Sequence, residues 1–296
     1  MAGNAPPVLL VPAMAGDQML LRAYLERIGY RGPVGPTLEC LRQIHLRQVL
    51  SIPYENIDVQ LGVPVDGDLE RIFEKVVVRR RGGWCYELNA LLGWALSEIG
   101  FDVMRASAGV LRDQRGDAAL GNHLILLVRL DQTYLLDQGL GDGIREPIPL
   151  MAGAYRQGPF TFRLATTSDG YWRFHSHSFG YPPTFDFRNE CADEPLLAAR
   201  CAALQTAPES NFVQNLICQI MGLEAVTCLT GRVLRIKSTD GVSKSLVSSP
   251  DELAETLDRV FGIRDVEVPR LWPKVVARHD LLFGDKQADQ IEVTGM

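Results

Sequence analysis

Cys85 occupies a position where a cysteine side chain can become chemically reactive. It follows the diglycine Gly82-Gly83 and Trp84, and it opens an apolar stretch with helical spacing. Unpaired N–H groups and the helix dipole at such a position stabilise a negative charge, and arginines 79–81 would add to this if they fold back. A thiolate, the form that attacks acyl groups, is therefore favoured. The alternative is a small buried apolar residue, as most free cysteines are.

A cysteine nucleophile needs a base, and the base needs an acceptor that orients it. Among the five histidines of the chain, His123 begins a predicted strand directly after Gly121-Asn122. The next predicted strand ends at Asp137. The order Cys, His, Asp along the chain therefore predicts a catalytic triad.

The hairpin that carries the last two residues permits this triad but does not require it. A tight turn at Asp131-Gln132 places His123 opposite Leu140. Asp137 then lies three residues away from this position on the strand, roughly 10 Å. A bulge or a longer loop must close this gap.

The first of the elements that must position these side chains are helices. The first hundred residues carry apolar residues at helical spacing, with N-cap and C-terminal stop residues at their ends. The predicted helices run from Asp17 to Gly29, from Thr37 towards Leu50, through Leu69 to Val76, and from the cysteine motif to Gly100.

The pattern then changes to strands separated by glycine and proline, which predicts an antiparallel sheet or barrel. In the last third, Ser249 followed by Pro250 predicts a helix start. Residues 211–221 are ambiguous, and the signal weakens from Arg264 onward. This order of helices, strands and mixed elements predicts an α+β fold. The predicted strands are 103–111, 123–130, 133–136, 160–165, 171–177 and 227–236.

Composition excludes several classes of protein. The 296 residues are 46% hydrophobic and 22% charged, which excludes a disordered, collagen-like or coiled-coil chain. The net charge of −6 gives no general attraction to nucleic acid or acidic membranes. Six cysteines are too few for a disulfide scaffold. Residues 1–16 lack a basic region and are interrupted by prolines, so we expect an irregular extension, no membrane span or export signal, and a cytoplasmic protein.

Three weaker motifs predict no site. His175 and His177 share a predicted strand face, but no third metal ligand lies near them in the sequence. The cysteine pairs 191/201 and 218/228 lack the C-x-x-C spacing of zinc sites. The glycine-rich residues 139–143 follow a strand, but later prolines prevent the helix that a phosphate loop requires. We therefore expect no metal.

Several of these motifs together resemble one family, the arylamine N-acetyltransferases. Residues 81–89, Arg-Gly-Gly-Trp-Cys-Tyr-Glu-Leu-Asn, resemble the signature around the nucleophilic cysteine of that family. Residues 52–58 resemble its Pro-Phe-Glu-Asn segment, with Tyr54 in place of phenylalanine. His123 and Asp137 stand where the family carries its other triad members. Later matches, within a resemblance that covers roughly residues 17–265, are Pro208, Ser210, Phe212, Asn215 and Gly231-Arg232-Val233-Leu234.

The resemblance implies a fold in three parts around a Cys-His-Asp core like that of transglutaminases and cysteine proteases. Residues 1–100 would form a helical bundle that carries the nucleophilic cysteine. Residues 101–205 would form an antiparallel β-barrel that carries the histidine and the aspartate. Residues 206–296 would form an α/β lid over the cleft for coenzyme and acceptor.

The resemblance also implies ping-pong acyl transfer with acetyl-coenzyme A as co-substrate. Cys85 would accept the acetyl group, and an arylamine, arylhydrazine or heterocyclic amine would then receive it. His123 would take the thiol proton, and Asp137 would orient the imidazole. The substrate- or cofactor-binding residues would be Tyr54, Leu140, Ser210 and Phe212.

One departure from the family pattern keeps other functions open. The family often has an aromatic residue where this chain has Leu140, so the acceptor pocket differs in shape. An amide synthase that releases polyketide chains would use the same nucleophile. A hydrolase or transglutaminase-like enzyme would use the same order of Cys, His and Asp. A binding protein on an inactive scaffold is the non-enzymatic alternative.

Overall fold

The computed structural model describes residues 15–291. Its first part is a group of helices packed around α5, which begins at Cys85 and ends where Gly100 adopts a φ of +99°. A π-helical turn over Glu74–Val78 continues α4. The helices of this part are α1 (Ala15–Arg27), α2 (Leu38–Ser51), α3 (Ile57–Leu61), α4 (Leu69–Phe73) and α5 (Cys85–Ile99).

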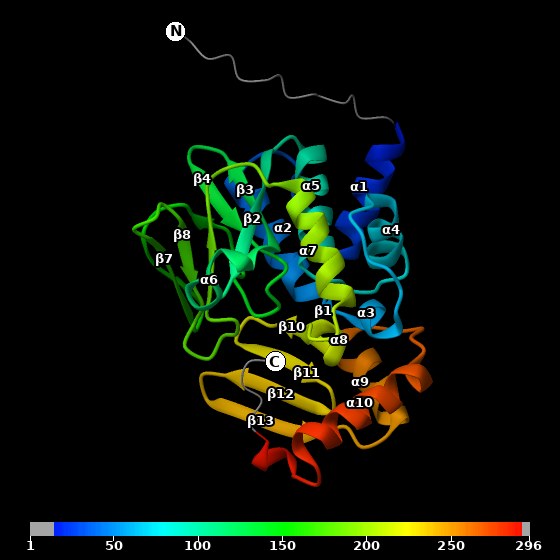
Figure 1. Ribbon diagram of the computed structural model, residues 1–296. Helices are drawn as coiled ribbons and strands as arrows, with labels where there is room; N and C mark the ends of the chain where they lie inside the picture. Colours follow the sequence, from blue (N-terminus) through cyan, green and yellow to red (C-terminus); the bar gives the residue numbers. More distant parts are fainter. Residues whose placement is uncertain (1–14, 292–296) are drawn as a thin grey trace.

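The second part is an eight-stranded antiparallel sheet that curls into a nearly closed barrel, drawn in green in Figure 1. Its strand order is β5-β4-β3-β2-β9-β8-β7-β6, and α6 (Arg112–Arg115) lies between β2 and β3. The strands are β2 (Asp102–Val110), β3 (Leu120–Arg129), β4 (Thr133–Leu136), β5 (Ile148–Pro149), β6 (Gly153–Gln157), β7 (Phe160–Thr166), β8 (Trp172–His175) and β9 (Thr184–Phe187).

The third part is a five-stranded antiparallel sheet of order β1-β10-β11-β12-β13, with α9 and α10 packed against it (Figure 1). Its edge strand β1 comes from the helical part, where Tyr54 pairs with Gln219. The elements are β1 (Tyr54–Glu55), α8 (Asn211–Gln214), β10 (Ile217–Met221), β11 (Ala225–Thr230), β12 (Val233–Ser238), β13 (Gly241–Leu246), α9 (Pro250–Phe261) and α10 (Val268–Phe283). Helix α7 (Glu194–Thr206) precedes this part and packs against β3 and the core around α5.

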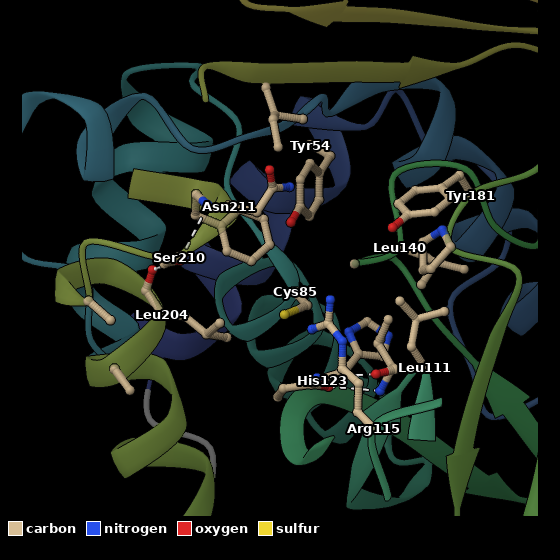
Figure 2. A pocket seen from close by; sticks show the side chains of 18 of the residues that line it. Tyr54, Cys85, Leu111, Arg115, His123, Leu140, Tyr181, Leu204, Ser210 and Asn211 are labelled. Atoms are coloured by element: carbon tan, nitrogen blue, oxygen red, sulfur yellow. Dashed lines mark hydrogen bonds between the residues drawn. The ribbon is translucent and has the colours of Figure 1, made fainter. Parts of the chain in front are cut away.

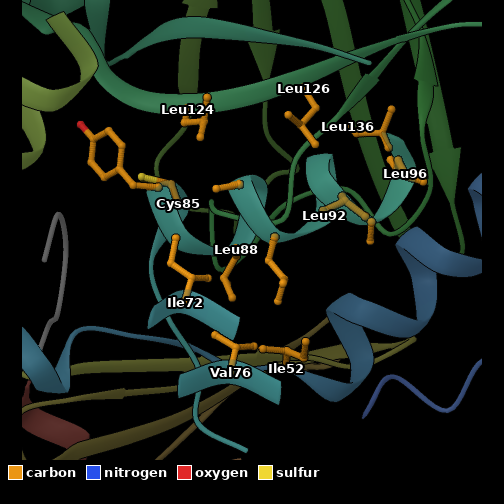
Figure 3. Close-up of a cluster of buried hydrophobic side chains, with 14 of the residues drawn as sticks. Ile52, Ile72, Val76, Cys85, Leu88, Leu92, Leu96, Leu124, Leu126 and Leu136 are labelled. Atoms are coloured by element: carbon orange, nitrogen blue, oxygen red, sulfur yellow. The ribbon is translucent and has the colours of Figure 1, made fainter. Parts of the chain in front are cut away.

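Strand β3 joins the helices to the barrel because both of its faces are buried. Leu124 and Leu126 belong to the core that surrounds α5, whereas Ile125 and Leu127 belong to the core inside the barrel. Figure 3 shows the first pair facing the apolar side chains of α5. This two-sided burial explains the continuous apolar run from Leu124 to Val128, directly after His123. It also fixes the strand against the helix that carries the cysteine.

The predicted register of the β3–β4 hairpin is wrong by one residue. Arg129 pairs with Thr133, so the turn contains three residues, 130–132, and not the two that we predicted. On the other side of β3, its pairing with β2 shifts at residues 121–122, directly before His123. A longer turn and a bulge are therefore both present, and Asp137 lies beyond the last residue of β4.

Other differences from the sequence prediction concern element ends and weak signals. Helix α1 begins at Ala15, so Asp17 is not its N-cap, and the rest of the predicted extension, residues 1–14, lies outside the described residues. Strand β8 ends at His175 and leaves His177 outside it. The predicted strand 227–236 contains a turn and divides between β11 and β12, and α7 and α10 were not predicted. Ser249 caps α9 as predicted. No helix within residues 15–291 is long and apolar enough to cross a membrane.

Candidate active site

Cys85 is the first residue of α5, and its helix start is fixed by a buried acidic side chain. The N–H of Trp84 donates to Glu87 Oε2 at 3.2 Å, which is one half of a capping box. Lys75 Nζ in turn lies 2.9 Å from Glu87 Oε1. The N–H groups of Cys85 and Tyr86 stand at the first two helical positions, which have no acceptor within a helix. The cysteine thus has the helix N-terminal surroundings that the sequence predicts.

A network of buried ion pairs stabilises the segment that precedes Cys85. Arg81 Nη2 lies 2.7 Å from Glu55 Oε1 and 3.0 Å from Asp58 Oδ1, and Asp58 also pairs with Lys75 at 2.7 Å. Arg79 and Arg80 are exposed. Only one of the three arginines folds back, and carboxylates neutralise it. Arg81 therefore supports the structure of the motif, and we correct the expectation of three arginines acting on the thiolate.

His123 and Asp137 are brought together despite their separation in the hairpin. His123 Nε2 lies 2.8 Å from Asp137 Oδ2, and both side chains are buried. Burial by itself lowers the pKa of His123, but the Asp137 carboxylate and then Cys85 outweigh this effect and raise the pKa to about 10. With Nε2 committed to Asp137, Nδ1 is the nitrogen that can exchange a proton with the thiol. Figure 2 shows Cys85 beside His123 in the cavity.

Asp137 is held by groups that the sequence prediction did not identify. Its Oδ1 accepts hydrogen bonds from Asn89 Nδ2 at 3.0 Å and from the N–H of Gly139 at 2.8 Å. Its own N–H donates to His45 Nε2 at 3.3 Å, while His45 Nδ1 donates to the carbonyl of Arg145 at 2.9 Å. Burial lowers the pKa of His45 to about 4, so this ring is neutral. Among these groups only Asn89 could have been identified from the sequence, because it lies one helical turn after Cys85 on the same face of the predicted helix.

Gly139 lets the chain after Asp137 cross directly over the cysteine. A Cβ at this position would lie 2.3 Å from Cys85 Cα and 2.4 Å from Cys85 Cβ. Real Cβ atoms do not approach backbone atoms this closely, so only glycine fits here. The loop that follows Asp137 is therefore part of the wall around the thiol.

These residues open onto a cavity of about 400 Å³. The four predicted binding residues, Tyr54, Leu140, Ser210 and Phe212, all line it together with Cys85. The Ser210 hydroxyl is already used, because it donates to the carbonyl of Leu204 and accepts from the N–H of Phe212. Burial, and then the nearby Cys85, raises the pKa of Tyr54 well above its usual value, so its phenol stays neutral.

Further lining residues come from segments that carried no motif. Tyr181 and Pro182 lie between β8 and β9, Arg115 ends α6, and Glu209 precedes α8. Figure 2 shows Tyr181, Leu140 and Leu111 on one side of the cavity and Leu204 and Ser210 on the other. The barrel and the segment around α7 and α8 thus face each other across the thiol. The further lining residues are Val110, Asn122, Gly139, Ala203, Ala207, Asn211, Ile217 and Gln219.

Metal-ligating side chains do not gather elsewhere in the part of the chain that the structure describes: no group of three or more histidines, cysteines, aspartates or glutamates there could hold a metal ion. His175 and His177 do not act together. His175 Nε2 contacts Arg163 Nη2 at 2.7 Å, whereas His177 Nε2 contacts Asp142 Oδ1 at 2.7 Å. All six cysteines are unpaired thiols, and Cys85 is the one among them that lines the cavity.

Comparison with known proteins gives a consistent result. A family model described as N-acetyltransferase matches residues 37–268. The arylamine N-acetyltransferase of Mycobacterium tuberculosis is 33% identical over 259 residues, which cover 84% of this chain and 90% of the relative. Arylamine N-acetyltransferase 1 of Homo sapiens is 30% identical over 290 residues, covering 88% of this chain and 98% of the relative.

Solved structures agree with the sequence relatives. The arylamine N-acetyltransferase of Mycobacterium marinum in complex with CoA superposes with a TM-score of 0.79 at 31% identity, covering 86% of this chain and 98% of that one. This similarity confirms the predicted α+β fold with its barrel. From the family model, these relatives and these structures it follows that the chain belongs to the arylamine N-acetyltransferase family.

Proposed function

We propose that this protein transfers an acetyl group from acetyl-coenzyme A to an arylamine, an arylhydrazine or a heterocyclic amine, through a thioester on Cys85. One observation carries the proposal: a helix-N-terminal thiol lines a cavity beside a histidine that a buried aspartate orients. The names of the relatives, and the CoA complex of one of them, supply the donor and acceptor classes.

In the first half-reaction, His123 takes the proton of the Cys85 thiol, and the thiolate attacks the thioester carbonyl of acetyl-coenzyme A. The N–H groups of Cys85 and Tyr86, at the first two positions of α5, donate to the oxyanion that forms. The bond to the coenzyme sulphur then breaks, and His123 returns the proton to the departing thiolate. Asp137 holds the imidazole in orientation and stabilises its charge.

In the second half-reaction, the amine nitrogen attacks the thioester carbon on Cys85. His123 accepts a proton from the nitrogen, and the carbon–sulphur bond breaks to release the acetylated amine. Tyr54, Leu140 and Phe212 offer apolar surface to the substrates, and Ser210 shapes the rim by capping α8. Because this chemistry requires a reduced thiol, we place the enzyme in the cytoplasm. We propose neither a nucleic-acid nor a membrane partner.

The test is intact mass spectrometry after mixing the protein with acetyl-coenzyme A and no amine. We expect one added acetyl group on Cys85, its release by an aromatic amine or by hydrazine, and no addition to Cys85→Ser. A folded wild-type protein that gains no acetyl group contradicts the proposal. An adduct that water removes as fast as amines do favours a hydrolase, and loading only by longer acyl thioesters favours an amide synthase.

A further inference from the structure

A second buried aspartate lies five residues after Asp137, on a loop that reads Gly-Leu-Gly-Asp-Gly over residues 139–143. Asp142 Oδ1 lies 2.7 Å from His177 Nε2, and Asp142 Oδ2 forms an ion pair with Lys237 Nζ. The side chains of Asp142, His177 and Lys237 are 0%, 2% and 9% exposed. We call these three residues the Asp142 cluster. The mechanism proposed above does not use it.

The members of the Asp142 cluster come from three separate parts of the fold. Asp142 follows β4, His177 lies in the segment between β8 and β9, and Lys237 lies on β12 of the five-stranded sheet. Lys237 Nζ also donates to the carbonyl of Phe179 at 3.2 Å. One ammonium group therefore ties two barrel loops to the second sheet.

Both of these loops supply the same wall of the cavity. The 139–143 loop carries Leu140, and the β8–β9 segment carries Tyr181 and Pro182. In Figure 2 the side chains of Leu140 and Tyr181 lie on the same side of the cavity. The Asp142 cluster thus lies where the two halves of this wall are anchored.

The 139–143 loop needs such an anchor because of its composition. Glycines at 139, 141 and 143 leave the backbone with many accessible conformations. The apolar side chain of Leu140 packs in the barrel core, and the position of its backbone also depends on what holds its neighbours. Arg145 contributes by donating from Nη1 to the carbonyl of Gly143 at 2.5 Å. Asp142 is the one residue of the loop whose side chain forms an ion pair.

The charges of the cluster depend on one another. Burial raises the pKa of Asp142, but the hydrogen bond to His177 and the charge of Lys237 outweigh it, and the net pKa lies below the usual value. Removing the carboxylate would leave a buried ammonium without compensation, which is far more costly than losing an exposed pair. Lys237 would then move towards solvent and release the carbonyl of Phe179.

We infer that the Asp142 cluster positions the acceptor amine by holding the wall of Leu140, Tyr181 and Pro182 in the shape that orients the acceptor ring at the thioester. The inference rests on the proposed function. Apolar and aromatic surfaces of this kind pack against flat rings. The acetyl group of the donor is small and makes little use of the wall. The three residues are positioning residues, because none of them lines the cavity.

The experiment separates three reactions of one protein. Loading of Cys85 by acetyl-coenzyme A, discharge by hydrazine and discharge by 4-methoxyaniline are each followed by quenched-flow mass spectrometry. For Asp142→Asn we expect loading and hydrazine discharge within about twofold of wild type. We expect the rate of discharge by the arylamine to fall about tenfold, with a raised KM for this acceptor. The reason is that a substrate misplaced by about 1 Å loses up to about 100-fold in rate. Hydrazine has no ring, so it does not need the wall.

Two further variants make the test specific. Lys237→Met leaves Asp142 paired with His177. The same three reactions are measured for this variant, and it replaces Asp142→Asn if that variant does not fold. Arg173→Gln is the matched control, since it removes a partner at 2.7 Å from the buried Asp186 but neither residue lines the cavity. We expect this control to leave the ratio of arylamine to hydrazine discharge unchanged.

The outcomes distinguish the inference from the proposed function. Wild-type protein that takes up no acetyl group contradicts the proposed function. Wild-type protein that loads and discharges, with Asp142→Asn and Lys237→Met discharging arylamine at the wild-type rate, contradicts the inference alone. Equal losses in all three reactions would also overturn it, because they would assign the cluster a role in stability only.

Discussion

Two buried aspartates that each pair with a histidine follow β4, five residues apart, and the two pairs differ in their third partner. Asp137 accepts from His123 Nε2 at 2.8 Å and Asp142 from His177 Nε2 at 2.7 Å, and all four side chains are buried. His123 faces the Cys85 thiol and the cavity. His177 instead packs against the rings of Phe160 and Phe179, and the charge on its aspartate is matched by Lys237.

On the proposed mechanism only the first pair takes part in the reaction, so an aspartate–histidine pair is not in itself catalytic. A buried carboxylate needs compensation, and a lysine supplies it permanently in one pair. In the other pair the compensating charge is the proton that His123 takes from the Cys85 thiol and, with a pKa of about 10, keeps at neutral pH. Asp137 receives only neutral donors besides the histidine, namely Asn89 and the N–H of Gly139. We therefore assign the reaction to the pair that contacts the thiol and has no fixed cation, and positioning to the pair that lysine neutralises.

The largest effect expected is that of Asp137→Asn on Cys85 loading. The amide can keep the donors of Asn89 and Gly139 on its oxygen, but its NH₂ group then faces His123 Nε2 and favours the wrong tautomer. We expect loading to slow by about 10⁴-fold, against no more than about twofold for Asp142→Asn. Quenched-flow mass spectrometry of both variants checks this. Losses of similar size would mean that the two pairs do not differ in role.

The glycines beside each pair give the next largest difference. Gly139→Ala forces a Cβ to within 2.3 Å of Cys85 Cα, whereas Gly143→Ala places one 3.2 Å from Leu140 Cβ. We expect Gly139→Ala to slow loading by about 100-fold or more, since displacing the reacting group by 1 Å has that cost. Gly143→Ala should leave loading near the wild-type rate. Loading rates and thermal unfolding of both variants are the measurements, and a Gly139→Ala variant with normal loading would refute the close approach.

The smallest expected effect concerns pH and His45, which supports Asp137. Its pKa of about 4 in the folded state lies below the usual 6.5, so the unfolded chain binds more protons between these values. Stability therefore falls as the pH drops, by about 1.5 kcal/mol from pH 6.5 to 5 for this group. His123 acts in the opposite sense: its raised pKa adds stability that is lost as the pH rises towards 10.

Urea unfolding of wild type and His45→Gln at pH 5 and 6.5 isolates this contribution. The variant should lose stability at both pH values and show a smaller difference between them. Identical pH dependence in the two proteins would mean that His45 is protonated in the folded state, and that its bond to the Asp137 N–H is absent.

The sequence could predict those features that depend on interactions between residues close together in the chain. Ser249 and Thr37 cap their helices through bonds to residues three positions away, so local spacing was sufficient. The helix start at Cys85 was predicted for the same reason, because it depends on residues close together in the sequence. The register of the β3–β4 hairpin depends on the turn, and a three-residue turn at 130–132 has no glycine or asparagine to mark it.

Contacts between distant segments could not be read from spacing. Asp142 meets His177 and Lys237 over 35 and 95 residues, and each of these residues alone resembles an ordinary polar side chain. Helix α10 was missed because Pro269 lies in its first turn and Pro273 in its interior, and prolines usually end a helix. Its buried face packs on the second sheet, and this packing stabilises a helix that the local sequence does not favour.

The two-residue strand β1 sets the order in which the site is completed as the chain is made. Cys85, His123 and Asp137 all precede β10, yet Ile217 and Gln219 of β10 line the cavity, and Gln219 pairs with Tyr54 of β1. At about 5–20 residues per second, a ribosome needs about 4–16 s to pass from the triad to this strand. During that interval the nascent chain already contains the three residues of the proposed triad, but not the strand that completes the cavity beside them.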